Sequence, residues 1–328
     1  MALLRFVKHY SFPLLLLVVG ILLFSKKEEL IDMGRVFLNM RPQWLLVALF
    51  FQYLTYFFEA KSYDVILRLW KYVVAVESIM KRLVISRFIG RSVPSLSIAG
   101  NVYVAKKFSE DGLPKNDAIQ TVLMNTVNYY LAVLIFAAFS YLYLWTHNKL
   151  TLVEVIFFAL FVLIAYAIFA VGYFGAKKHR RLGVYYDKFI GRFHTAASEL
   201  FGEGNSKQQE RPEEGKIDRR EAPMLVPMAF VWEIARFLAD SITIYFIFVG
   251  LGERTHFGIV MVGFAMATIF GLISFFPGGI GQFEAAQILV YGSLGVPVQA
   301  AIAATLIYRL LSFWLPLPLG AYLYKRKG

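Results

Sequence analysis

Two oppositely charged residues, Glu284 and Arg309, lie inside apolar segments near the end of the chain. Glu284 comes about one turn after the sequence Pro-Gly-Gly-Ile-Gly at 277–281, which interrupts an apolar run. In a bilayer, freed backbone groups and unpaired charges each cost several kcal/mol, so they survive only inside protein or beside a water-filled cavity. Because transporters build substrate sites from broken helices with ionisable residues at membrane depth, this pattern indicates a binding site for a polar group.

Two interpretations of this pair are open on sequence alone. Glu284 is either an acid in the first helical turn, stabilised by the helix dipole and paired with Arg309, or a carboxylate that faces a transport cavity. Both hold if one partner of the pair also meets a phosphate. Backbone amides at the helix start can bind such a phosphate with Arg309 as counter-charge, which makes Gly278, Gly279 and Gly281 candidate binding residues.

A second group of charges lies in the apolar segment 223–251. Glu233, Arg236 and Asp240 are spaced by three and four residues, so they share one helix face and Arg236 can bridge both acids. In a membrane helix such a face must point to the bundle interior, pair internally or line water. We expect the triplet either to form an internal structural network or to line the cavity.

Polar residues also cluster in the first half of the chain. Thr121, Asn125 and Asn128 share a helix face, for which hydrogen bonding between helices is the simpler interpretation and a binding role the alternative. Arg87 and Arg91 are four residues apart, just before a predicted helix break. They either extend to lipid phosphates at the membrane surface or capture an anionic headgroup at a cavity mouth.

Composition places these residues in a membrane protein. Hydrophobic residues are 58% and charged residues 17%, against roughly 45–50% and about 25% in soluble domains. The net charge of +12 fits Lys and Arg that hold loops at the cytoplasmic face and attract anionic lipid, so nucleic acid is not an expected partner. There is no cysteine and the histidines show no ligand spacing, so no metal or cofactor is expected. Motifs for nucleotide hydrolysis, serine hydrolases and zinc peptidases do not occur, which argues against an enzyme.

The apolar pattern predicts an all-α polytopic membrane protein with about seven or eight transmembrane helices in a single domain, residues 1–328. Uninterrupted spans are expected at 10–24, 44–60, 117–145, 151–175, 223–251, 257–276 and 298–323, and broken segments at 83–104 and 277–294. The polar interval 176–222 is predicted to hold an interfacial amphipathic helix followed by a mobile stretch.

The distribution of Lys and Arg orients these spans. Loops 61–82 and 176–222 hold five and eleven of them, whereas loops 146–150 and 252–256 hold one each. The positive-inside rule therefore places the rich loops and the N-terminus in the cytoplasm, with the protein in the plasma membrane. Segment 83–104 is then re-entrant. The basic C-terminal tail is expected in the cytoplasm, which requires segment 277–294 to cross; if that segment is re-entrant, the tail lies outside.

A short internal repeat relates the two broken segments. At an offset of 183 residues, Pro94 matches Pro277 and Pro114 matches Pro297, and a few apolar residues of the following helix are identical. Asn101 then lies opposite Glu284. The identities are few, but breaks coincide at both ends, and opposite directions of the helices that follow would make this an inverted repeat.

The C-terminal motif resembles a known family. It comprises the sequence at 277–281, Glu284-Ala285-Ala286, Gly295-Val296, Tyr308-Arg309-Leu310 and a Pro-rich end with Pro316, Pro318 and Gly320. This combination is similar to the lysylphosphatidylglycerol synthase transmembrane-domain family, a flippase-like group also called UPF0104. The first half departs from the family pattern, because Asn101 and Val104 stand where similar members often carry an acid and an arginine. Asn125 and Asn128 likewise occupy positions where charged residues are usual.

The resemblance implies translocation of a lipid between leaflets, either an anionic or aminoacylated phospholipid or a polyprenyl-linked lipid. It also implies that synthase activity resides in a separate soluble domain, so this chain, which ends at Gly328, is not expected to be the synthase. We therefore expect an energy-independent lipid flippase or transporter. The alternatives are a non-transporting membrane partner of a lipid- or glycan-modifying enzyme, and an integral-membrane transferase with Glu284 or Asp240 as base.

Overall fold

The structure is a computed structural model that describes residues 40–92, 98–147, 222–272 and 279–327, with the single residues 155, 159 and 162. Within these ranges the chain forms helices joined by short turns, and no strand occurs in them. The all-helical class expected from the sequence is confirmed for this part of the chain. The expected spans 10–24 and 151–175 and the loop 176–222 lie almost entirely outside the described residues, as do Pro94, Pro277 and Gly278.

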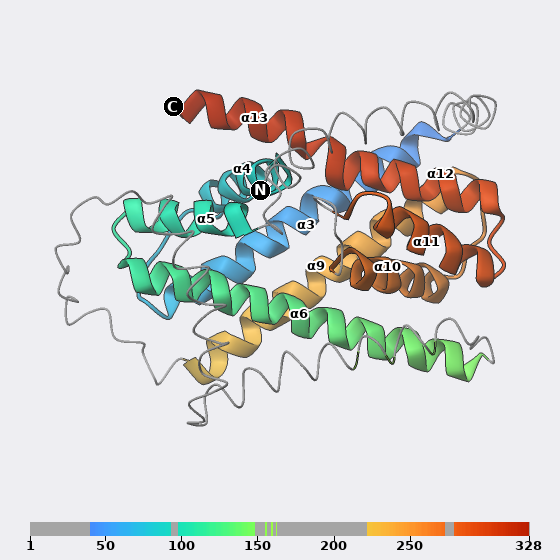
Figure 1. The fold of residues 1–328 in the computed structure, drawn as a ribbon, viewed down its shortest axis with the longest axis horizontal. Coiled ribbons are helices and arrows are strands. Elements are labelled where there is room, and N and C mark those ends of the chain that lie inside the picture. The colour runs from blue at the N-terminus through green and yellow to red at the C-terminus, as the bar shows by residue number, and fades with distance from the viewer. Residues whose placement is uncertain are drawn as a thin grey trace, which may run out of the picture.

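Four long helical elements run through the described structure (Figure 1). Three are single helices: α3 (Pro42–Arg68), α6 (Lys115–Thr146) and α9 (Ala222–Gly250). The fourth is composite, with α12 (Val298–Arg309), a π-helical turn η3 (Leu310–Trp314) and α13 (Pro316–Lys327) in succession. α3 and α9 lie against each other in opposite directions, because Trp44 stacks on Phe246 and Phe58 stacks on Trp232.

Helix α3 is longer than the span 44–60 expected from the sequence, which ended at the first charged residues. It continues to Arg68 because its last two turns are held by ion pairs along one face. Asp64 accepts from Arg68 at 3.0 Å and lies 3.5 Å from Lys61. Pairs at these helical spacings stabilise a helix, so the charges extend α3 instead of ending it.

Two pairs of shorter helices form antiparallel hairpins. The first consists of α4 (Val76–Ser92) and α5 (Ile98–Glu110), and the second of α10 (Phe257–Leu272) and α11 (Gln282–Ser293). The helices of each pair approach closely: a Cβ built on Gly100 would lie 2.4 Å from the Ser86 carbonyl, and one on Gly263 would lie 2.0 Å from the Tyr291 ring. The two pairs lie toward opposite ends of the bundle, with α4 and α5 on the left and α10 and α11 on the right of Figure 1.

The second hairpin corrects one expectation and bears on another. Segment 257–276 was expected to be an uninterrupted span, but α10 has 16 residues. At 1.5 Å per residue it is about 24 Å long, less than a hydrocarbon core of roughly 30 Å. For segment 277–294 the sequence left a crossing and a re-entrant path open, and α11 folds back along α10 as a re-entrant segment would. Among the described residues, two segments are long and apolar enough to span a bilayer by length and composition, Lys115–Thr146 and Val298–Arg326.

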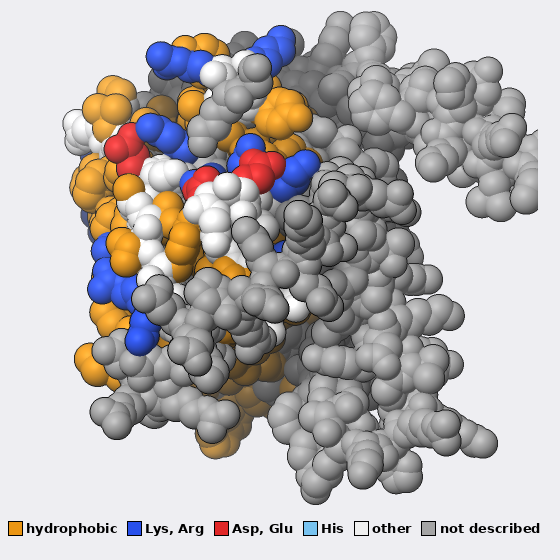
Figure 2. Space-filling model, turned by 90° about the vertical axis from the view of Figure 1, so that its left-hand side faces the viewer, with side chains coloured by type: hydrophobic (Ala, Val, Ile, Leu, Met, Phe, Trp, Pro, Cys, Tyr) orange, Lys and Arg blue, Asp and Glu red, His pale blue; other side chains and the backbone are white. Residues whose placement is uncertain are grey.

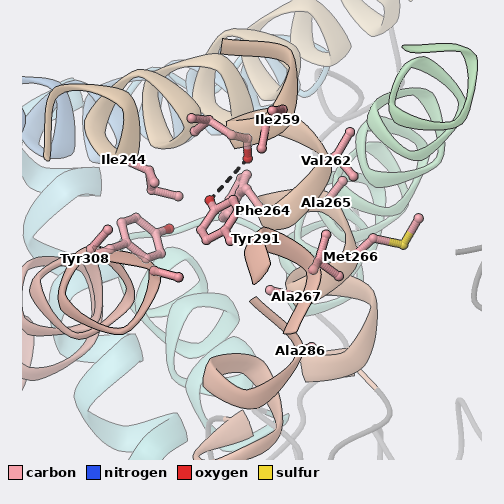
Figure 3. Close-up of a cluster of buried hydrophobic side chains, with 14 of the residues drawn as sticks. Ile244, Ile259, Val262, Phe264, Ala265, Met266, Ala267, Ala286, Tyr291 and Tyr308 are labelled. Atoms are coloured by element: carbon pink, nitrogen blue, oxygen red, sulfur yellow. Dashed lines mark hydrogen bonds between the residues drawn. The ribbon is translucent and has the colours of Figure 1, made fainter. Parts of the chain in front are cut away.

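The apolar interior is divided into two main clusters, one around each hairpin. One cluster joins α10, α11 and α12 to the second halves of α6 and α9, and the other joins α4 and α5 to α3 and the first half of α6. Figure 3 shows part of the first cluster, in which the buried Tyr291 hydroxyl donates to the Val260 carbonyl at 3.3 Å. The two clusters are separated by a zone between the α4–α5 pair and the α10–α11 pair.

The end of the bundle where α4 starts and α5 and α13 end carries many charges. Figure 2 looks at this end and shows Lys, Arg, Asp and Glu side chains gathered among hydrophobic ones. Several are paired, as in Arg82 with Asp111 and Lys81 with Glu77. The basic tail of α13 also lies at this end, because Gly320 packs on Phe88 of α4.

The turns that lead into α6 and α12 have the same local geometry. Gly112 and Gly295 both adopt a left-handed backbone, with φ of 109° and 87°. Pro114 and Pro297 then cap the two helices with φ of −52° in each case. These positions are related by the same offset of 183 residues at which the sequence repeats.

Candidate functional site

Eight ionisable side chains gather between the two apolar clusters, where the hairpin tips meet the π-helical turn. Five elements contribute them: α3, α4, α9, α11 and α12. They are Glu59, Arg87, Arg91, Glu233, Arg236, Asp240, Glu284 and Arg309. The arginines and carboxylates are equal in number, so the cluster is formally neutral. We call this group the charge cluster.

Glu284 and Arg309 form an ion pair within the charge cluster. Glu284 Oε1 accepts from Arg309 Nε at 2.5 Å, and Glu284 Oε2 accepts from the Gly281 amide at 2.7 Å. Glu284 is thus both the capping acid of α11 and the partner of Arg309, as two of the sequence interpretations stated. Arg309 is only 7% exposed and lies over the rings of Phe283 and Phe313. The pair therefore lies inside the bundle.

The backbone before α11 needs glycine at two positions. Gly281 is the N-cap residue with φ of 84°, and Gly279 has φ of 70°. Side chains with a Cβ rarely adopt this left-handed backbone. A Cβ on Gly279 would also lie 3.3 Å from the Cα of Gly271 in α10. These glycines therefore fix the turn that presents Glu284, and Gly278 lies outside the described residues.

Glu59 is the central acid of the charge cluster, and it was not among the residues singled out from the sequence. It pairs with Arg87 of α4 and lies 3.5 Å from Arg236 of α9. Arg236 in turn donates to Glu233 at 3.1 Å. The sequence did contain a feature that could have identified Glu59, because this residue is an acid within the expected span 44–60. The Arg87 side chain is partly buried in this ion pair, and its expected position at the membrane surface or at a cavity mouth stays a prediction.

Asp240 corrects the expectation that Arg236 bridges two acids. Arg236 pairs with Glu233 and Glu59, whereas Asp240 makes no ion pair with any residue in the described ranges. Its Oδ1 accepts instead from Tyr308 at 3.0 Å, from Thr55 at 3.4 Å and from Gln52 at 3.5 Å. All three contacts converge on one oxygen, which leaves Oδ2 with no hydrogen bond to the described part of the chain.

Arg91 binds backbone in the π-helical turn. It donates to the carbonyls of Phe313 at 2.8 Å and Ser312 at 3.2 Å, and it stacks over the Phe313 ring at 4.2 Å. The sequence offers a reason, because the Leu315 N–H reaches the Leu310 carbonyl and the next residue, Pro316, has no N–H to continue the ladder. Arg91 thus supplies a donor that the helix lacks. Its charge is not matched by a direct carboxylate partner in the described ranges.

The asparagines singled out in the first half of the chain are not members of the charge cluster. Asn125 accepts from the Ser62 hydroxyl at 2.8 Å, and both are buried. The expected interhelical hydrogen bonding is therefore confirmed for Asn125, whereas the Thr121 hydroxyl donates to the Asp117 carbonyl of its own helix at 2.8 Å. Asn101 lies in the first turn of α5, half-buried, and α5 packs mainly on α4 and α6. The structure thus does not bring Asn101 and Asn125 into contact with Glu284 or Arg309.

Several buried polar atoms in or beside the charge cluster make no hydrogen bond with the described residues. They are Nε of Arg87, Nε of Arg236, Oε1 of Glu233 and the hydroxyl of Tyr56. The Arg87 guanidinium lies over the Tyr56 ring at 4.7 Å. Buried polar groups in proteins are nearly always hydrogen-bonded to protein or to ordered water. These atoms of the charge cluster can therefore bond water or another polar group.

Comparison with known proteins identifies the family. Residues 12–320 match the lysylphosphatidylglycerol synthase TM region. The chain therefore belongs to this family of membrane proteins.

Three relatives define the range of similarity. The chain is 23% identical over 291 residues to a UPF0104 membrane protein of Methanocaldococcus jannaschii, covering 87% of this chain and 85% of that protein. It is 32% identical over 92 residues to a UPF0104 membrane protein of Methanothermobacter thermautotrophicus, covering 28% of each. It is 33% identical over 79 residues to phosphatidylglycerol lysyltransferase of Staphylococcus aureus, which is 24% of this chain and 9% of that enzyme.

Proposed function

We propose that this membrane protein moves a lipid with a phosphate-containing headgroup between the leaflets of the bilayer, without a catalytic step of its own. The charge cluster carries the proposal. Eight ionisable groups from five helical elements lie between two apolar clusters. Burying this many charges in a membrane protein costs free energy, and such residues typically mark a path for a polar cargo.

The proposal requires a polytopic bundle, and the surface of the described helices supports this. Val127, Leu131, Ile135, Phe139 and Leu142 of α6 are all exposed and lie on one helix face. Such apolar stripes on soluble proteins normally mark interaction surfaces, whereas in a bilayer they face lipid. Exposed apolar residues on the other long elements, including Leu46 and Phe50 of α3 and Leu310 and Trp314 of the composite helix, extend the same argument.

An inverted repeat is the architecture we assign to this bundle. The pairs α4–α5 and α10–α11 lie toward opposite ends of the bundle, and the long helices that follow them begin with matching glycine and proline conformations. Transporters with this symmetry bind cargo where the two repeats meet. If the charged end faces the cytoplasm, the tail of α13 lies in the cytoplasm as well. This placement does not require α11 to cross the membrane.

Within the site we assign roles by charge. Arg91 donates to neutral carbonyl oxygens, whereas the other arginines of the charge cluster pair with carboxylates. Arg91 is therefore the arginine best able to exchange its bonds for bonds to a lipid phosphate. Asp240 Oδ2 can accept from a donor elsewhere in the headgroup. Glu284, Arg309, Glu233, Arg236 and Glu59 hold the surrounding charges in place. The cargo class this favours is an anionic phospholipid or a polyprenyl phosphate.

A translocation assay in liposomes tests the proposal. Purified protein is reconstituted with a fluorescent phosphatidylglycerol, and the fraction of label protected from an impermeant quencher is measured over time. We expect Glu284→Gln and Arg309→Ala to slow exchange at least about tenfold if each removes roughly 1.4 kcal/mol of pathway stabilisation. Lys81→Gln, at an exposed pair outside the charge cluster, serves as control.

Wild-type rates from both folded variants would count against the site, and no exchange by wild-type protein with either phosphatidylglycerol or a polyprenyl phosphate would count against transport. A stoichiometric enzyme that copurifies with a protein inactive in this assay would instead favour a role as a membrane partner of that enzyme.

A further inference from the structure

A polar cavity, separate from the charge cluster, lies at the end of the bundle opposite the charged end. It has a volume of about 520 Å³ and is formed where α3 begins, α9 ends and α10 begins. The residues that matter for its chemistry are Arg41, Glu253, Arg254, His256, Tyr245 and Phe257. This volume is typical of sites for small polar ligands and headgroups. None of these residues belongs to the charge cluster.

The cavity has an excess of positive charge. Arg41 and Arg254 are permanently charged, His256 can add a third positive charge, and Glu253 is the single acid in the lining. Within the described ranges, neither arginine makes an ion pair with any carboxylate of the protein. Both arginine side chains are exposed. Two guanidinium groups at one cavity form a site for a phosphate, because each can offer parallel N–H donors.

The rest of the lining includes aromatic and aliphatic side chains beside the polar Thr255. Tyr245 packs edge-on against Phe257 with ring centroids 5.7 Å apart. The Arg41 amide donates to the Gly250 carbonyl at 3.1 Å, which ties the start of α3 to the end of α9. Trp44 stacks on Phe246 one turn deeper in the bundle. Aromatic side chains beside arginines at helix ends are typical of the headgroup level of a membrane.

We propose that this cavity binds the phosphate of an anionic phospholipid headgroup at the membrane face opposite the charged end. Arg41 and Arg254 hold the phosphate, and Tyr245 and Phe257 contact the glycerol and the first part of the acyl chains. The apolar part of the wall favours a lipid over a free anion, because a free anion has no apolar group to contact it. From Asp240 to Gly250 is ten residues of α9, or about 15 Å along the helix, so this is a separate site. It does not depend on the transport proposal.

Native mass spectrometry of the full chain in detergent tests the site. Phosphatidylglycerol and phosphatidylcholine with the same acyl chains, and inorganic phosphate in a separate series, are titrated against wild-type protein, the Arg41→Gln/Arg254→Gln variant and a charge-matched control, Lys81→Gln/Lys325→Gln. We expect wild-type protein and the control to prefer phosphatidylglycerol, and the double variant to lose about tenfold in affinity for it. The single variants replace the double variant if the latter does not fold.

Three outcomes would overturn the assignment. They are equal affinity for the two lipids in wild-type protein, unchanged affinity for phosphatidylglycerol in the folded variants, and arginine-dependent binding of inorganic phosphate without any preference for phosphatidylglycerol. The last would assign the cavity to a soluble anion. Because the measurement is of binding and involves no lipid movement, a negative result leaves the transport proposal standing, and a failed transport assay leaves this site standing.

Discussion

The Tyr308 hydroxyl donates to Oδ1 of Asp240 at 3.0 Å and so joins α12 to α9 at the centre of the bundle. Both residues are at least nine-tenths buried. Tyr308 is the neighbour of Arg309, which pairs with Glu284 of α11. Two adjacent side chains of α12 thus fasten it to two different helices, one through a neutral donor and one through an ion pair.

Tyr308→Phe removes the hydroxyl while keeping the ring. We expect it to destabilise the protein by about 1–3 kcal/mol, because a buried carboxylate loses its shortest hydrogen bond. The thermal unfolding midpoint in detergent is the measurement. Tyr291→Phe is the matched control, since its hydroxyl donates to a carbonyl outside the charge cluster. Because Asp240 belongs to the proposed site, we expect lipid exchange to fall in Tyr308→Phe and to be retained in Tyr291→Phe.

Glu59→Gln should be more damaging than Glu233→Gln. Glu59 serves both Arg87 and Arg236, whereas Arg236 keeps Glu59 when Glu233 is changed. Leaving a buried charge without its partner costs about 3–5 kcal/mol. We therefore expect the larger loss of stability for Glu59→Gln in chemical unfolding of the purified protein. Equal losses in the two variants would contradict the central place of Glu59.

The bond between Arg91 and the π-helical turn can be tested by restoring the missing donor. Arg91→Gln should destabilise the protein, because the Ser312 and Phe313 carbonyls lose their bonds. In a Pro316→Ala background the helix regains an N–H that can bond a carbonyl of the π-helical turn. Arg91→Gln should then cost about 0.5–1.5 kcal/mol less, the net worth of one hydrogen bond. An identical cost in both backgrounds, measured as a double-mutant cycle, would refute this explanation of Arg91.

Two glycine substitutions compare a left-handed backbone position before α11 with a helical position inside it. We expect Gly279→Ala to destabilise the protein by about 1–2 kcal/mol, because alanine disfavours the left-handed backbone seen there. Gly292→Ala, inside α11 with nothing within 4 Å of an added Cβ, should instead raise stability by about 0.5–1 kcal/mol through helix propensity. The comparison uses thermal midpoints. A destabilised Gly292→Ala would show that α11 does not have this environment.

The sequence predicted helices and breaks well where apolar runs were long. The boundaries of α6 and α9 and the start of α11 at Gly281 follow from hydrophobic length and from glycine and proline. The end of α3 was missed because its final turns depend on ion pairs involving Asp64. α10 was taken as a full span because composition does not reveal a chain reversal that depends on Gly263 fitting against Tyr291.

The site was predictable in its members more than in its connections. Periodicity along α9 placed Glu233, Arg236 and Asp240 together, and that face is buried or nearly so. Partners on other helices could not be derived from spacing. Glu59 replaced Asp240 as the second acid for Arg236 because α3 packs along α9, a contact between residues far apart in sequence. The relation of Arg91 to Pro316 required the same kind of tertiary knowledge.

The interrupted hydrogen-bond ladder between Leu310 and Pro316 has a mechanical consequence. Helices bend most easily at π-helical turns and prolines. α12 is fastened to α9 and α11 on one side of this joint, and α13 packs on α4 on the other. Under the transport proposal, bending at this joint would tilt one hairpin against the other. A single hinge would then be enough to expose a site between the hairpins to one face of the bundle at a time.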